Sequence, residues 1–175
     1  MRRIQQVSRW MVIILTGAIV VADILILAIF AFPELSVQPF FDAHIITTRA
    51  PTLENWQRAA MAGLAVLGLA PAYYVLLHFR ALFRLFAAGA IFAGLATKHL
   101  FKAAIGMIVG GVITIVNTTL GGLVLTARFA PGQHVFTVSV SSVQLAWILA
   151  GLILAVMSWV MQEAARLSEE NAGFV

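Results

Sequence analysis

A single aspartate near the centre of a long apolar run is the residue of this sequence best placed to do chemistry. Asp23 is the only charged residue between Met11 and Phe32. In a helix it would lie about 18 Å from Met11, where an ionised carboxylate costs roughly 2.5–3.5 kcal/mol in a bilayer. We therefore expect Asp23 to be protonated and to have a polar partner.

Asn117 is the partner that the spacing predicts. It lies in the run "TIVNTTLGG", about 21 Å along a helix from Ala103. The two runs would cross a membrane in the same direction, so the two depths nearly coincide. We expect an Asp23–Asn117 hydrogen bond, assisted by Thr114 or Thr118, that joins two helices. The alternative is a proton or cation relay through Asp23, although a relay usually needs several ionisable groups in series.

The other reactive residue types do not favour an enzyme. The chain has no cysteine, which excludes disulfides and thiolate chemistry. Asp42, His44 and His134 are a weak pattern for a metal, because such sites usually need three or four ligands. No serine, glycine or carboxylate pattern marks a nucleophile, a phosphate loop or an acid–base pair. We predict a protein without catalytic residues, metal or cofactor.

The composition places these residues in a membrane. Apolar residues make up 62% of the 175-residue chain and charged residues only 10%, far from the balance of a soluble domain. Four apolar runs predict an all-α integral membrane protein in which residues 1–175 form one membrane domain. The first run is too long for a signal peptide. The predicted spans are 11–32, 59–79, 103–127 and 143–161.

The basic residues predict the orientation of these spans, because short cytoplasmic flanks are rich in Lys and Arg. One side of the membrane would carry eight of the 11 basic residues and the other side three. Both termini and the middle connection are therefore expected in the cytoplasm. Basic residues that flank spans also argue against direct binding of nucleic acid. The eight are Arg2, Arg3, Arg9, Arg80, Arg84, Lys98, Lys102 and Arg166, and the three are Arg49, Arg58 and Arg128.

The connection between the second and third spans has the pattern of an amphipathic helix. Arg80/Arg84 and Lys98/Lys102 are basic pairs four residues apart, with apolar residues between them. Such a segment lies in the membrane interface, and Gly89 should divide it into two helical pieces, which either stand apart from the adjoining spans or extend them into the cytoplasm. It serves either as a docking surface or as an anchor on anionic lipid.

The outer connections and the small residues carry further patterns. Alternation in "HVFTVSVSS" and the β-branched "HIITTR" predict a small extracytoplasmic β-hairpin, and Thr52 is the expected N-cap of the second helix. Gly106-x-x-x-Gly110 and Gly151-x-x-x-Ala155 would let helices approach closely. Their neighbour would be a helix of the same chain or a second copy in a homo-oligomer.

The C-terminal stretch "EAARLSEENAGFV" concentrates acidic residues. The fourth helix should continue past Met161 into this tail, where Glu169 and Glu170 oppose the helix dipole. They would instead contact the protein's own basic connection or a second protein. The predicted cytoplasmic interaction surface consists of Arg80, Arg84, Lys98, Lys102, Arg166, Glu169 and Glu170.

Two stretches, "FRLFAAGAIF" after the second span and the tail just quoted, resemble family 2975 of the bacterial domains of unknown function. The resemblance implies a multi-pass protein of the bacterial cytoplasmic (inner) membrane with four spans and no established activity. It also implies a regulatory or sensory role beside a small cytoplasmic helix-turn-helix regulator. The alternatives are a small transporter or ion-conducting bundle that uses Asp23, and a structural subunit of a membrane assembly.

Overall fold

The computed structural model describes residues 2–32, 35, 54–89, 94–128 and 138–172. Four long helices account for nearly all of them, and each is long and apolar enough to cross a membrane. The protein is thus a multi-pass membrane protein, as its composition predicts. The described part of the chain contains no strand. The helices are α1 (Arg2–Ala31), α3 (Asn55–Ala87), α4 (Gly94–Thr126) and α5 (Ser142–Ala172).

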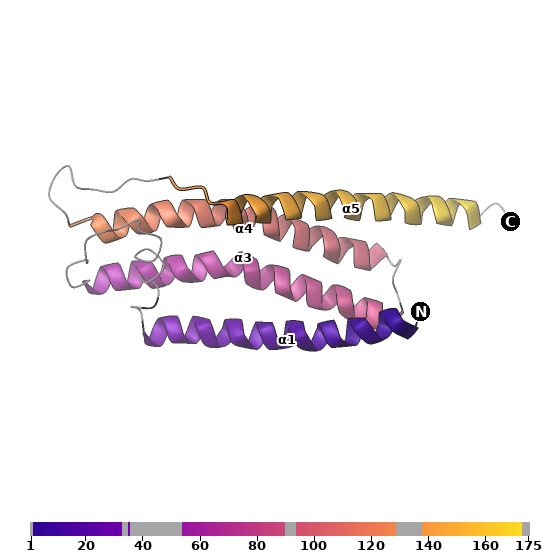
Figure 1. Cartoon of the computed structure of the whole chain (residues 1–175), viewed down its shortest axis with the longest axis horizontal. Coiled ribbons are helices and arrows are strands. Elements are labelled where there is room, and N and C mark those ends of the chain that lie inside the picture. The colour runs from indigo at the N-terminus through magenta and orange to yellow at the C-terminus, as the bar shows by residue number, and fades with distance from the viewer. Residues whose placement is uncertain (1, 33–34, 36–53, 90–93, 129–137, 173–175) are drawn as a thin grey trace.

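The helices lie side by side in one row, in the order in which they occur along the chain (Figure 1). α3 packs on α1, α4 on α3, and α5 on α4. Among the described residues no other pair of helices approaches with its backbones. The start of α1, the end of α3, the start of α4 and the end of α5 lie at one end of the row, which we call the terminal end, and α5 projects beyond its neighbours there.

Glycines on two sides of α4 set the close approach of its neighbours. A Cβ atom at Gly106 would lie 2.8 Å from a methyl group of Val75 on α3. In the contact between α4 and α5, the glycine is Gly151 of α5. A Cβ atom there would lie 2.8 Å from the backbone oxygen of Ala104 and 3.1 Å from the backbone nitrogen of Ile108, both on α4. The small-residue motifs therefore pack against helices of the same chain, which decides between the two alternatives for these glycines.

Large apolar side chains cover the outward surfaces of the row. Leu27 is 68% exposed and Phe30 is 64% exposed. An apolar surface of this kind is unfavourable in water, but in a bilayer it faces lipid. Trp10 and Trp159, which are 62% and 68% exposed, lie toward the terminal end, where tryptophan suits the membrane–water interface.

The helices extend beyond the predicted spans. α3 continues to Ala87 and α4 begins at Gly94, so the basic pairs predicted in an amphipathic connection lie on the spanning helices themselves. No separate interfacial helix occurs among the described residues of this connection. Gly89 ends the first piece as predicted: its φ of 87° is in the left-handed region, which costs glycine little, and its N–H donates to the Phe86 carbonyl at 3.0 Å.

Two predictions for the outer connections have different outcomes. Thr52 is not the N-cap of α3; Glu54 takes that position, because Gln57 reaches back to accept from its backbone N–H at 3.1 Å. Residues 138–141 of the predicted hairpin have no regular secondary structure. The rest of the hairpin, at 44–49 and 134–137, lies outside the described residues.

The contact at Gly151 gives the first testable prediction. Gly151→Ala would place a methyl group against backbone atoms that cannot move aside, so α4 and α5 must separate. We expect a loss of about 1–3 kcal/mol in stability, measured as unfolding of the purified protein in detergent. Gly17→Ala is the matched control, because its Cβ would meet nothing within 4 Å and alanine is the better helix former. Equal stability of the two variants would contradict the close contact.

Candidate functional site

The intramembrane acid and amide do not form the predicted pair. Asp23 is exposed on α1 and its carboxyl group interacts with the side chain of Tyr73 on α3. Asn117 on α4 donates from Nδ2 to the Leu64 carbonyl of α3 at 2.8 Å. The row explains the difference: α3 lies between α1 and α4, so equal depth does not bring Asp23 and Asn117 together.

Asn117 nevertheless joins two helices, as an interhelical amide should. Its approach to α3 depends on Gly68, whose Cβ would lie 2.7 Å from the Asn117 Nδ2 atom. The Asn117 Oδ1 atom is buried without a hydrogen-bond partner among the described residues. Thr114 and Thr118 do not assist, because their hydroxyls donate to carbonyls of α4 itself, at 2.8 and 2.9 Å.

Polar contacts between the middle of the row and its terminal end connect three helices. Arg80 on α3 donates from Nε to Thr16 Oγ1 of α1 at 2.9 Å. His78 on α3 and His99 on α4 form a hydrogen bond of 3.2 Å between their Nδ1 atoms. This bond requires one ring to donate and the other to accept. The ring of Tyr74 packs edge-on against His78 at 4.3 Å between centroids.

The residues of the predicted interaction surface are therefore divided among different faces. Arg80 turns toward α1, whereas Arg84 shares a shallow depression with His99. Lys98 and Lys102 are exposed on α4.

On the tail, Arg166 and Glu163 form an exposed ion pair of 3.8 Å, and α5 runs past Met161 as predicted. Glu169 and Glu170 lie in α5, but their side chains are outside the described part, so their contact with the basic residues stays a prediction.

Sequence reasoning missed a polar cluster at the opposite end of the row. Gln57 is 3% exposed and donates from Nε2 to the Val124 carbonyl at 2.9 Å. This carbonyl belongs to the last turn of α4, where no helical N–H remains to bond it. Arg128 forms an ion pair with Glu54, which also accepts from the Trp56 indole at 2.9 Å. The spacing Glu54-x-x-Gln57 resembles a capping box and could have indicated this cluster.

The described residues contain no group of three or more His, Cys, Asp or Glu side chains that could hold a metal ion. Asp42, His44 and His134, the weak metal pattern of the sequence, lie outside the described residues. Several polar side chains inside the row instead form hydrogen bonds with a neighbouring helix. This arrangement can hold helices in register, and it leaves Lys98 and Lys102 exposed toward the terminal end.

A double-mutant cycle tests the contact between α3 and α4. Gly68→Ala should displace the Asn117 amide and cost roughly 0.6–2 kcal/mol, the range of interhelical hydrogen bonds. In the Asn117→Ala background the same change should cost nothing, because among the described residues of the other helices Asn117 alone lies within 4 Å of the added methyl group. Gly63→Ala is the control on the same helix, since its Cβ would meet nothing. Equal costs of Gly68→Ala in both backgrounds would refute the contact.

Two substitutions in the cluster at the opposite end should lower the stability of the protein by different amounts. Gln57→Met keeps the shape of a buried side chain but removes two hydrogen bonds, so we expect a loss of about 1–3 kcal/mol. Arg128→Ala removes an ion pair whose side chains are 55% and 46% exposed, which should cost at most about 1 kcal/mol. Detergent unfolding of both variants checks the order. A larger cost for Arg128→Ala would show that the ion pair, rather than Gln57, holds this end.

Comparison with known proteins gives a family but no activity. No curated protein matches the chain, and no solved structure matches it either. One protein family, described as protein of unknown function (DUF2975), matches residues 8–173. The match extends from within α1 to the end of α5, and it includes the stretch "FRLFAAGAIF" and all but the last two residues of the tail stretch. The chain therefore belongs to the DUF2975 family.

Proposed function

We propose that this protein is a regulatory membrane protein without catalytic activity, whose terminal end binds a soluble cytoplasmic protein. The observation that carries the proposal is that the start of α1, the end of α3, the start of α4 and the projecting part of α5 lie together at one end (Figure 1). The part of α5 that projects beyond its neighbours is not covered by the other helices of the row, so a partner can contact it.

The charges at this end support a protein partner. Lys98 on α4 and both Glu163 and Arg166 on α5 are exposed, so the end carries cations and an acid at its surface. Mixed charge of this kind gives specificity to a protein–protein contact. The orientation with this end in the cytoplasm follows from the positive-inside rule.

A small helix-turn-helix regulator is the partner that we propose. This choice rests on the family resemblance of the "FRLFAAGAIF" and tail stretches, both of which reach the terminal end. Binding there would hold the regulator at the membrane and away from DNA, so that release from the membrane protein would change transcription.

The structure favours this role over transport through Asp23. Asp23 interacts with Tyr73 of the adjacent helix, a contact that suits the pairing of α1 with α3. A relay of carboxylates would need further acidic residues in series with it, and α3 and α4 contain none.

The test is recovery of the regulator with the full-length membrane protein from solubilised membranes. Lys98→Glu with Arg166→Glu should lower recovery about tenfold, as expected when two charges of a contact are reversed. Arg128→Glu is the control, because Arg128 is an exposed cation at the opposite end. Equal recovery by the double variant and the wild type would overturn docking at this end, as would an equal loss with Arg128→Glu.

A further inference from the structure

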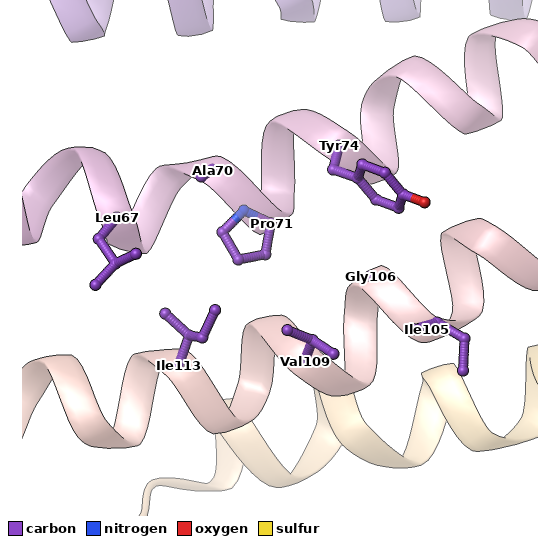
Figure 2. Close-up of a pocket in the computed structure, with 8 residues that line it drawn as sticks. All are labelled: Leu67, Ala70, Pro71, Tyr74, Ile105, Gly106, Val109 and Ile113. Carbon is purple, nitrogen blue, oxygen red and sulfur yellow. The ribbon is translucent and has the colours of Figure 1, made fainter.

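An open apolar groove follows the contact between α3 and α4 (Figure 2). It has a volume of about 330 Å³, and no residue of α5 lines it among the described residues. Among the lining residues, the Tyr74 hydroxyl is the one polar side-chain group. The principal side chains are Leu67, Pro71 and Tyr74 from α3 and Ile105, Val109 and Ile113 from α4.

The same seam becomes basic toward the terminal end. Arg84 of α3 and His99 of α4 line a second depression there. Tyr74, His78, Ala81 and Arg84 follow one another at spacings of three or four residues, which places them on one side of α3. The apolar groove and the basic depression therefore lie along a single seam between the two helices.

The charge along this seam is of one sign. Lys102 lies three residues from His99 on α4 and close enough for its charge to act on His78. Neither α3 nor α4 contains an acidic residue, so neither helix supplies a counter-charge to Arg84 or Lys102. An anionic group is the ligand that this end of the seam would stabilise.

We propose that the seam between α3 and α4 binds an anionic phospholipid, with the end of one acyl chain in the apolar groove and the phosphate at Arg84, His99 and Lys102. The distances agree with this occupant. Ten residues separate Tyr74 from Arg84, or about 15 Å of helix, which equals the hydrocarbon thickness of one leaflet, half of about 30 Å. A lipid whose phosphate lies at Arg84 thus reaches the groove with the end of its chain.

A lipid fits this seam better than a second copy of the chain. Basic pockets between spanning helices on the cytoplasmic side are typical sites for anionic head groups. The groove supplies what a surface cation alone does not, a defined place for the acyl chain. The lipid site uses Arg84, His99 and Lys102, whereas the test of the protein partner changes Lys98 and Arg166, so different variants test the two proposals.

The experiment measures thermal stabilisation of the full-length protein in detergent by added phosphatidylglycerol and by phosphatidylcholine. We expect phosphatidylglycerol to stabilise the protein at lower concentrations than phosphatidylcholine does. The double variant Arg84→Gln with Lys102→Gln should raise the half-saturating concentration of phosphatidylglycerol about 30-fold, as the loss of two basic contacts implies. Arg3→Gln with Arg9→Gln is the matched control, because these exposed cations lie toward the same end on α1. An equal response to both lipids, or an equal effect of the control pair, would overturn the proposal.

A second pair of variants tests the groove independently of charge. Val109→Trp should fill the groove and raise the half-saturating concentration about tenfold, comparable to the loss of about two buried methylene groups. Val112→Trp is the control, since Val112 is 49% exposed on the same helix but does not line the groove. Unfolding in the absence of lipid shows whether each variant is folded. If Val109→Trp leaves lipid stabilisation unchanged but alters the oligomeric state, the groove is an interface between copies and the proposal is wrong.

Discussion

The close approach of α4 to both of its neighbours is the constraint on which the rest of the structure depends. Inside a bilayer, helices gain little from burying apolar surface, because lipid is as apolar as the side chains, and association relies on van der Waals contact and hydrogen bonds. α4 meets this requirement with glycine on two sides: Gly106 and Gly110 toward α3, and Gly111 toward α5. Larger residues at these positions would separate the helices and remove the polar contacts between them.

The polar contacts depend on this approach and add specificity to it. Asn117 bonds a backbone carbonyl of α3 across a gap that Gly68 keeps open. Ser158 of α5 likewise donates to the Thr97 carbonyl of α4 at 2.8 Å, and both residues are buried. Each bond fixes the relative height of two helices, which apolar packing alone leaves free. The row therefore has a defined register, and the basic groups of α3 and α4 meet at one end.

Much of the architecture could be predicted from the sequence, and the partners of individual polar groups could not. Hydrophobic runs identified four spans, and glycine spacing identified the contact surfaces of α4. Depth along a helix gave the heights of Asp23 and Asn117 but contained no information on which helices are neighbours. Tyr73 could not be chosen over Asn117 without the order of the row. The capping role of Gln57 was visible in its spacing from Glu54, whereas its bond to Val124 depends on tertiary packing.

The order of the row has a consequence for how the protein is made. Every close helix contact joins two helices that are consecutive among the four, so each new helix needs only the surface of the one inserted before it. No helix has to enter between two that are already paired, and no early helix has to wait for a distant one. Contacts between sequence neighbours form fast, because little chain entropy is lost in bringing them together. The row can therefore assemble progressively while the chain is still being synthesised.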